Sequence, residues 1–413
     1  MIMQDNEKKP ALRFKGFTDP WEQRKLGDVA DIVGGGTPST NNPNYWDGDI
    51  DWYAPAEIAG QIYFDSSQRK ITEQGYENSS AKMLPPGTVL FTSRAGIGKT
   101  AILSKKGCTN QGFQSIVPHN DELDSYFVFS RTDELKQYGE LVGAGSTFVE
   151  VSGKQMAAMN LKMPTTIEEQ QTIGRFFKRL DTLITLHQRK YEKLVNIKKS
   201  MLDKMFPKNG ASVPEIRFKG FTDPWEQRKL EEYLEVSGQK NFEGIYTKED
   251  VLSVSGDFGI VNQIEFQGRS FAGASVANYG VVETGDIVYT KSPLKSNPYG
   301  IIKANKGKNG IVSTLYAVYK PKQSANPEFV QIYFEQDARM NNYMHPLVNK
   351  GAKNDMKVSA ENALKGQIVF PDIKEQRTIS EFFRNLDTLI TLHQRKLEKL
   401  QNIKKSCLEK MFV

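Results

Sequence analysis

The chain has 413 residues, 38% of them hydrophobic and 25% charged, which is typical of globular proteins and long enough for two or three domains. No apolar run reaches the roughly 18 residues of a membrane helix, and two cysteines argue against a disulfide framework or a thiolate metal site. The net charge of +6 permits a polyanionic partner without requiring one. With no apolar secretory segment in MIMQDNEKKPALRF, we expect a cytoplasmic protein that contacts no membrane.

Two sequence repeats divide the chain into equivalent halves. The stretch RFKGFTDPWEQRKL is identical at residues 13–26 and 217–230. The stretch LDTLITLHQRK is identical at 180–190 and 386–396, and similar residues flank it at a constant offset of 206. This period is far longer than the roughly 20 to 50 residues of solenoid repeats, so we interpret the chain as a duplicated domain pair.

The layout predicts four parts. Residues 1–165 hold an N-terminal segment and a first variable domain, and 166–207 a first long helix. Residues 208–371 hold a linker and a second variable domain, and 372–413 a second long helix.

The longer repeat predicts the two helices. Its apolar residues recur three and four positions apart, and no Pro or Gly follows Gly174, so the first helix extends over about 33 residues, or roughly 50 Å. Two such helices bury their apolar stripes as a coiled coil, which the pseudo-two-fold of a duplicated chain makes antiparallel. The predicted seam consists of Ile173, Phe177, Leu180, Ile184, His187 and Leu194 in the first helix and Ile379, Phe383, Leu386, Ile390, His393 and Leu400 in the second.

His187 and His393 occupy equivalent positions near the midpoints of the two helices. An antiparallel pair brings such counterparts together, so we predict that both lie in the seam. Two imidazoles alone make a poor metal site, and no metal is expected.

The variable bodies, residues 27–165 and 231–371, have the pattern of an α+β fold. Strand-like runs such as GTVLFTS, QSIVP, GDIVYTK and GIVSTLYAVY are bounded by Gly, Pro and Asn, with helical stretches such as SYFVFSRTDELKQYG between them. Gly87–Thr92 aligns with Gly285–Thr290, and Gly112 with Gly310, both at an offset of 198. We interpret the bodies as one fold with two different surfaces.

Several loops combine Lys or Arg with Asn or Gln, as in KKGCTNQGFQS and NKGAKNDMK. Sequence-specific DNA contact requires cations for phosphates and amides or guanidinium groups for base edges, although any single residue here also fits a solvated surface charge. The candidate DNA-binding residues are Arg94, Lys99, Lys106, Asn110, Gln111, Lys291, Lys295, Lys303, Lys353 and Asn354. Each long repeat, residues 168–206 and 374–412, carries nine Lys or Arg against five Asp or Glu, which is either a solvated exterior or a surface that attracts the DNA backbone.

Two motifs invite enzymatic interpretations. SRAGIGKTA ends like a phosphate-binding loop, but Ser93 stands where the first glycine is required. NNPNYW is similar to the catalytic loop of amino-methyltransferases, but Asn44 replaces its second proline. A surface turn explains each motif better.

The repeats, together with RFKGFTDPWEQRKLGDV, SRAGIGKTAI, NQGFQSIVP and the EQ..I..FF..LD start of each helix, resemble the specificity (S) subunit of type I restriction-modification systems over essentially the whole chain. The resemblance implies two target recognition domains, each reading one half of a split double-stranded DNA site, and a helical spacer between them. It implies that two methyltransferase (M) and two restriction (R) subunits bind this non-catalytic chain, and that they use S-adenosylmethionine, ATP and magnesium.

From the residues alone, we expect a quasi-two-fold protein with two different DNA-reading ends to bind a non-palindromic site. The two halves of that site should lie about one turn of the DNA helix apart. A structural adaptor that assembles partners without reading sequence is the alternative. Phe14, Phe17 and Trp21 and their copies Phe218, Phe221 and Trp225 fit an apolar anchor at the entrance of each body, with a partner contact as the other interpretation.

Overall fold

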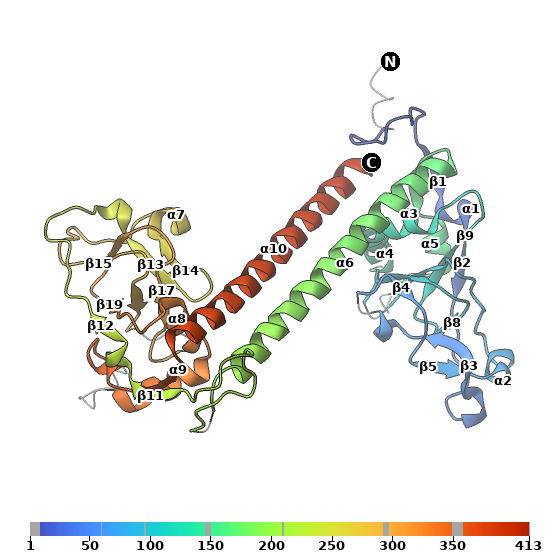
Figure 1. The fold of residues 1–413 in the computed structure, drawn as a ribbon. Helices are drawn as coiled ribbons and strands as arrows, with labels where there is room; N and C mark the ends of the chain where they lie inside the picture. The colour runs from blue at the N-terminus through green and yellow to red at the C-terminus, as the bar shows by residue number, and fades with distance from the viewer. Residues whose placement is uncertain are drawn as a thin grey trace, which may run out of the picture. The chain divides into compact units, whose positions relative to one another are not determined.

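A computed structural model of the chain describes residues 9–58, 60–94, 96–144, 150–208, 210–291, 297–348 and 358–412 (Figure 1). The chain forms two compact units, Met1–Gln188 with Arg395–Val413 and Arg189–Gln394. Each unit therefore contains one variable body, the start of the long helix that follows it and the end of the other long helix. None of the helices in the described ranges combines the length and apolar character that a membrane-spanning helix requires.

The first unit contains a mixed five-stranded sheet in the order β2-β9-β6-β7-β4, a three-stranded sheet in the order β5-β3-β8 and the two-stranded pair β1-β10. The strands are β1 (Glu22–Lys25), β2 (Ala30–Gly34), β3 (Trp46–Tyr53), β4 (Tyr63–Phe64), β5 (Arg69–Ile71), β6 (Val89–Phe91), β7 (Thr100–Leu103), β8 (Cys108–Thr109), β9 (Gln114–Pro118) and β10 (Asn160–Met163). The short helices are α1 (Leu26–Val29), α2 (Glu73–Glu77), α3 (Ser125–Ser130), α4 (Thr132–Gly143) and α5 (Gly153–Ala157).

The second unit contains a four-stranded sheet in the order β12-β19-β16-β17 and three two-stranded pairs, β11-β20, β13-β14 and β15-β18. The strands are β11 (Glu226–Lys229), β12 (Leu234–Val236), β13 (Leu252–Ser255), β14 (Gly259–Asn262), β15 (Gly280–Val282), β16 (Ile287–Tyr289), β17 (Ile302–Ala304), β18 (Gly310–Val312), β19 (Ala317–Pro321) and β20 (Gln367–Phe370). The short helices are α7 (Gln263–Gln267), α8 (Pro327–Tyr333) and α9 (Asp337–Met344).

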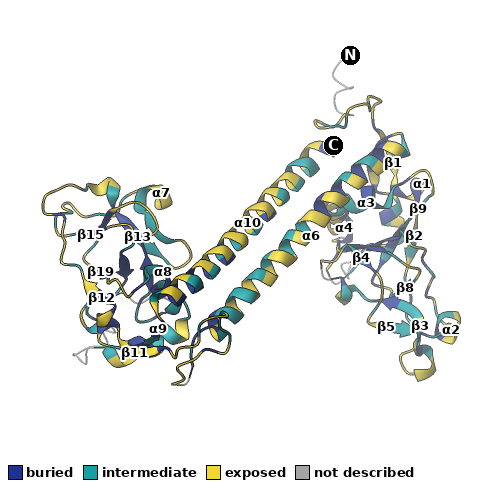
Figure 2. Cartoon of the chain, in the orientation of Figure 1, coloured by how far each residue is buried: buried dark blue, intermediate teal, exposed yellow. Residues whose placement is uncertain are grey.

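These elements confirm the predicted α+β fold of the bodies. The runs GTVLFTS, QSIVP and GDIVYTK contain β6, β9 and β16, and each centres on buried apolar residues (Figure 2). The run GIVSTLYAVY differs from a single strand, because a turn in which Tyr316 N–H donates to Ser313 O at 3.0 Å separates β18 from β19.

The two long helices are α6 (Ile167–Lys204) and α10 (Ile373–Met411), of 38 and 39 residues. They are longer than the predicted 33 residues because polar caps extend both starts. Asp372 Oδ1 accepts from the backbone N–H groups of Lys374 and Glu375, at 2.7 and 3.1 Å. Thr166 Oγ1 similarly accepts from Glu169 N–H at 3.4 Å. Such caps satisfy donors that a helix start leaves unpaired.

Equivalent ion pairs join the two long helices in each unit. In the first unit, Asp181 on α6 lies 2.6 Å from Lys404 Nζ on α10. In the second, Asp387 on α10 lies 2.8 Å from Lys198 Nζ on α6. Each unit thus pairs the start of one helix with the end of the other, so the helices are antiparallel, and the offset of 206 relates the two contacts as a pseudo-two-fold requires.

Each copy of RFKGFTDPWEQRKL adds a strand to its body. β1 pairs with β10, which leads into α6, and β11 pairs in the same antiparallel register with β20, which leads into α10. Trp21 and Trp225 are both 3% exposed, and Phe14 packs edge-on against Phe176 at 5.5 Å. These contacts confirm the predicted apolar anchor for Phe14, Trp21 and Trp225, whereas Phe17 and Phe221 are half-buried outside the hydrophobic clusters of the described residues.

A buried ion pair joins each copy of that motif to its long helix. Arg13 donates from Nε and Nη2 to the two carboxylate oxygens of Glu169, both at 2.7 Å. Arg217 contacts Glu375 in the same way, at 2.8 and 2.7 Å. The glutamate side chains are 2% and 1% exposed, so each carboxylate depends on its arginine for charge compensation.

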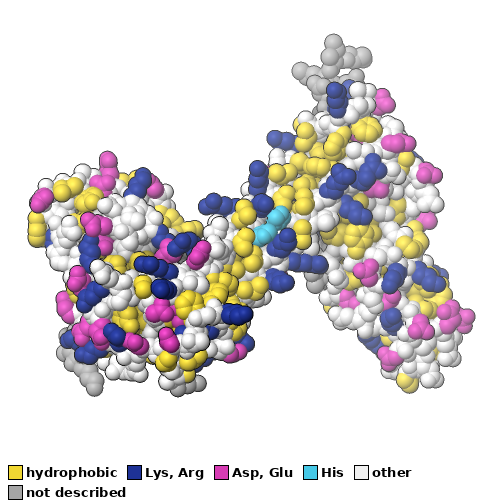
Figure 3. Space-filling model, in the orientation of Figure 1, with side chains coloured by type: hydrophobic (Ala, Val, Ile, Leu, Met, Phe, Trp, Pro, Cys, Tyr) yellow, Lys and Arg dark blue, Asp and Glu magenta, His cyan; other side chains and the backbone are white. Residues whose placement is uncertain are grey.

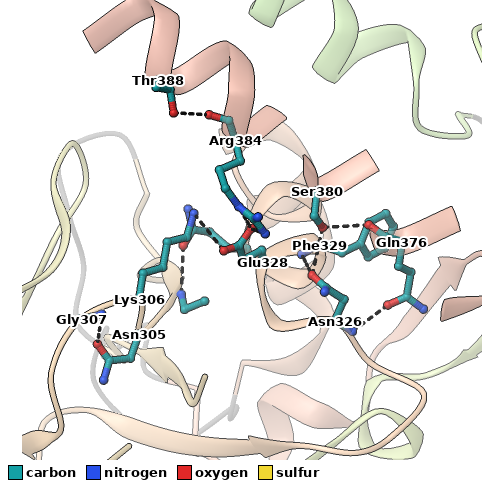
Figure 4. A network of polar contacts seen from close by, with 12 residues as sticks. Asn305, Lys306, Gly307, Asn326, Glu328, Phe329, Gln376, Ser380, Arg384 and Thr388 are labelled. Atoms are coloured by element: carbon teal, nitrogen blue, oxygen red, sulfur yellow. Dashed lines mark hydrogen bonds and ion pairs between the residues drawn. The ribbon is translucent and has the colours of Figure 1, made fainter. Parts of the chain in front are cut away.

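A glutamine forms a second contact that is repeated in both units, and Figure 4 shows the copy at Gln376. The side-chain amide bonds to backbone atoms just before α3 or α8 and to the carbonyl of the proline at the end of the body. The partners of Gln170 are Asp124 N, Glu122 O and Pro164 O, at 3.1, 3.0 and 3.5 Å, and those of Gln376 are Asn326 N, Ser324 O and Pro371 O, at 2.9, 3.0 and 2.9 Å.

The buried ion pair yields a stability prediction. Arg217→Ala leaves Glu375 buried without its partner, and we expect the free energy of unfolding of the second unit to fall by about 3–5 kcal/mol. Urea unfolding followed by circular dichroism measures this loss. Arg228→Ala is the control, because Arg228 pairs with Glu226 on the exposed surface of the same motif and its loss leaves stability nearly unchanged. Equal shifts in the two variants contradict the anchoring role of Arg217.

Candidate nucleic-acid interface

Three loops of the first unit meet beyond the ends of β2, β6 and β8. Gly36 N–H donates to Thr109 O, and Ser93 N–H donates to Gly112 O, each at 2.8 Å. A Cβ atom on Gly35 would lie 1.9 Å from Asn110 O, so only glycine permits the backbones to approach this closely. A Cβ atom on Gly36 would likewise lie 2.4 Å from Ala81 N, so two glycines of the GGG run, Gly35 and Gly36, are packing requirements of this loop cluster.

The loop cluster gathers three of the predicted DNA-binding residues. Asn110 Oδ1 accepts from Gly112 N–H at 2.8 Å, and Gln111 Oε1 accepts from the Thr37 hydroxyl. Arg94 lies over the same turn, because a Cβ atom on Gly112 would be 3.6 Å from its Nε. Arg94 is 39% exposed, and its Nη1 reaches Glu150 only at 4.0 Å. A guanidinium group and two amides on one exposed surface match the donors and acceptors that base edges present.

The remaining candidates in the first unit lie at the margin of the loop cluster or elsewhere. Lys99 is exposed at the end of the loop that begins at Ser93, where its backbone N–H donates to Thr92 Oγ1 at 2.9 Å. Lys106 is exposed in the turn before β8, at the opposite end of that strand from Asn110. The structure therefore groups Lys99 with the loop cluster more closely than Lys106.

The phosphate-binding interpretation of SRAGIGKTA does not fit this geometry. Such a loop leads into a helix whose N-terminus faces the phosphate, but Lys99 is followed by strand β7. Gly98 packs against α4 instead, because a Cβ atom on it would lie 2.3 Å from Lys136 Cγ.

In the second unit, Lys291 remains a candidate for ligand contact. Its Nζ is part of an exposed hydrogen bond to Thr314 O at 2.9 Å, and its φ of 30° is unusual for a residue with a side chain. Burial, with the nearby charge of Lys240, lowers the pKa of Lys291. Lys295, Lys353 and Asn354 lie outside the described residues.

Lys303 must be removed from the DNA-binding set. It lies on β17 with 9% of its surface exposed, and burial lowers its pKa. The charges that act on it belong to the protein itself, including Glu335 and Lys198. A side chain enclosed in this way does not reach a DNA backbone on the surface.

Sequence reasoning missed Thr37 and Glu150, which contact Gln111 and Arg94 across long stretches of chain. The signal for Thr37 was the adjacent GGG run, which marks a close backbone approach. No local pattern singled out Glu150.

The predicted seam residues differ in burial. Ile173, Phe177 and Leu180 are buried in the core of the first unit, and Ile379 and Phe383 in the core of the second, while Leu386 is buried at 6% exposure. The five core residues therefore join the body to its helix. The half-buried positions are Ile184, His187, Leu194, Ile390, His393 and Leu400. His187 and His393 belong to different units, and their mutual approach stays a prediction.

Comparisons with known proteins agree with one family. Residues 18–196 match the model of the type I restriction modification DNA specificity domain. The chain is 33% identical over 230 residues to the type I restriction enzyme MjaIX specificity subunit of Methanocaldococcus jannaschii, covering 54% of this chain and 53% of that protein. It is 28% identical over 200 residues to the EcoR124I/EcoR124II specificity subunit of Escherichia coli, covering 44% and 48%. The chain thus spans about half the length of these curated relatives.

One solved structure shares the fold over nearly the full length. The S subunit of a type I restriction-modification system from M. genitalium aligns with a TM-score of 0.58 at 13% identity, covering 98% of this chain and 99% of that one.

Proposed function

We propose that this chain, whose residues 18–196 match the model of the type I restriction modification DNA specificity domain, is the DNA specificity subunit of a type I restriction-modification system. The observation that carries the proposal is a repeated frame that holds two different loop surfaces. Both units use the same strand pairing, the same buried arginine–glutamate pair and the same glutamine contact. The loops beyond that frame differ.

Equivalent loop positions carry different chemistry in the two bodies. The loop after β6 corresponds to the loop after β16 at the offset of 198. Ser93 corresponds to Lys291, whose ammonium group replaces a hydroxyl. Because direct readout depends on the donors and acceptors presented to each base, unlike loops favour unlike half-sites. We therefore propose a bipartite, asymmetric target with one body reading each half.

The long helices set the unspecified spacer in this proposal. At about 1.5 Å per residue, 38 residues give α6 a length of roughly 57 Å, compared with roughly 34 Å for one turn of DNA. The catalytic work belongs to partners in this scheme. Two M subunits methylate adenine with S-adenosylmethionine, and two R subunits use ATP and magnesium for translocation and cleavage, whereas this chain supplies recognition and assembly.

A body exchange tests the proposal directly. Residues 27–165 are replaced by the corresponding body of a relative, and methylated sites are mapped in cells that express the chain with its M subunit. We expect one half-site to change while the other half and the spacer remain. Exchange of residues 231–371 is the matched control and changes only the other half. An unaltered methylated motif contradicts sequence recognition by the bodies and favours an adaptor that does not read DNA.

The spacer is tested by inserting four residues after Lys190 and four after the equivalent Lys396, so that both helices grow together. Each insertion adds about 6 Å, or roughly two base pairs. We expect a longer unspecified spacer between unchanged half-sites, or loss of binding where the helical phase between the halves is wrong. If methylation mapping finds an unchanged spacer length, the long helices do not set the distance between the half-sites.

Individual contacts are tested by salt-dependent binding to a duplex that contains the mapped site. Arg94→Ala removes an exposed cation from the loop cluster and should weaken binding. If Arg94 contacts phosphate, the slope of log affinity against log salt falls by about one; if it reads a base, affinity falls selectively for the native base. The buried Lys303→Met is the control and leaves the slope unchanged. Equal effects of the two substitutions argue against the loop cluster.

A further inference from the structure

One exposed face of α6 in the first unit gathers three cations. Arg175, Lys178 and Arg179 are exposed and one helical turn apart, and with Thr182 and Leu183 they line a shallow depression of about 470 Å³. Within the described residues, no carboxylate oxygen lies within 4.0 Å of a side-chain nitrogen of these three residues. In Figure 3, Lys and Arg side chains gather over this part of α6. We call this surface the α6 cationic face.

The α6 cationic face continues into the first body. Arg175 and Lys178 also line a groove of about 400 Å³ together with Tyr63, Pro86, Gly87 and the carboxylate residue Asp124. Lys178 Nζ lies 5.1 Å from the centre of the Tyr63 ring, which positions that cation over the groove. Asp124 offsets part of the charge in this groove, but among the described residues the depression on α6 contains three cations and no acidic residue, which suits an acidic protein segment.

The α6 cationic face lies apart from the loop cluster that we propose reads DNA. The groove contains Pro86 and Gly87, which precede β6, whereas Ser93 and Arg94 follow it. The two surfaces thus occupy opposite ends of the same strand. A protein partner therefore explains the cations better than the duplex bound at the loop cluster.

The equivalent face of α10 has lost this charge. Arg175, Lys178 and Arg179 correspond at the offset of 206 to Glu381, Arg384 and Asn385. Figure 4 shows that Arg384 is also neutralised by Glu328, whose Oε2 accepts from its Nε and Nη2 at 2.9 and 2.6 Å. Glu328 stands two residues after Asn326, the N-cap of α8. In the first body, the residue two positions after Asp124, the N-cap of α3, is Tyr126, which carries no charge to neutralise a cation on α6.

The apolar part of the two faces is the same. Leu183 is 42% exposed and its counterpart Leu389 is 45% exposed, and Leu186 and Leu392 are exposed to 45% and 43%. Exposed leucines repeated in both helices give identical partners the same apolar contacts, so that charge is what distinguishes the two faces.

We propose that the α6 cationic face docks an acidic segment of the M subunit and makes the binding of two identical M subunits unequal, the tighter one binding the first unit. This inference rests on the proposed function, which supplies two copies of one partner. Attraction of acidic groups to three exposed cations is screened by salt, so the inequality is largest at low ionic strength and shrinks as salt is added.

The test titrates the purified M subunit of the same system into the full chain by isothermal calorimetry at low and high salt. We expect the wild type to bind two M subunits with affinities about tenfold apart at low salt. The variant Arg175→Glu/Lys178→Arg/Arg179→Asn copies the α10 face onto α6. It should retain the fold and bind both M subunits with the weaker affinity. Glu381→Arg/Asn385→Arg is the reciprocal variant and should strengthen the weaker site.

The outcomes separate the two levels of the proposal. Two equal sites in the wild type, or an affinity gap that survives in the copied variant, overturns the unequal docking while leaving the proposed function intact. A variant that binds the M subunit normally but loses affinity for duplex DNA shows instead that the α6 cationic face contacts the DNA backbone. A wild-type chain that binds no M subunit overturns the proposed function and this inference with it.

Discussion

The buried ion pair at the start of each long helix is the constraint on which the frame depends. A carboxylate removed from water costs several kcal/mol unless a well-placed cation compensates it. Glu169 and Glu375 receive that cation from arginines 156 and 158 residues away, at the opposite end of the body. Because a buried charge left without its partner is strongly destabilising, we infer that this contact favours the native closure of each body over arrangements that separate the pair. This contact explains why the two copies of RFKGFTDPWEQRKL are identical, since each copy must fit the equivalent start of a long helix.

The parts of the fold that depend on local periodicity could be predicted from the sequence. The spacing of Ile173, Phe177 and Leu180 specifies a helix stripe whatever surrounds it, and the duplicated repeat then specifies its partner. The loop cluster is a different case, because Thr37 and Gln111 are 74 positions apart and meet only through the packing of glycine backbones. Lys303 shows why the exposure of a charged residue could not be predicted from the sequence. Its sequence neighbourhood matches a surface loop, and its burial on β17 arises from tertiary contacts that no local pattern contains.

The two copies of the frame are not interchangeable in every detail. Gly174 packs against the first body so closely that a Cβ atom would lie 2.5 Å from Asp124 Oδ1. The equivalent of Gly174 is Ser380, whose hydroxyl donates to Asn326 Oδ1 at 3.0 Å (Figure 4). Each long helix is thus matched to an N-cap residue of its own body, which is Asp124 of α3 in the first unit and Asn326 of α8 in the second. The small sequence differences between the two long helices therefore match each helix to the body against which it packs.

The glutamine contact explains how bodies with different surfaces share one frame. Gln170 and Gln376 bond to backbone N–H and C=O groups of their bodies, which every residue except proline supplies in full. Such contacts hold the path of the chain at the edge of the body while leaving its side chains unrestricted. The frame therefore places few demands on body sequence, and loops such as those at Ser93 and Lys291 can diverge without loosening the helices. A recognition protein of this design can acquire a new target by changing one body while the other half of the chain remains as it is.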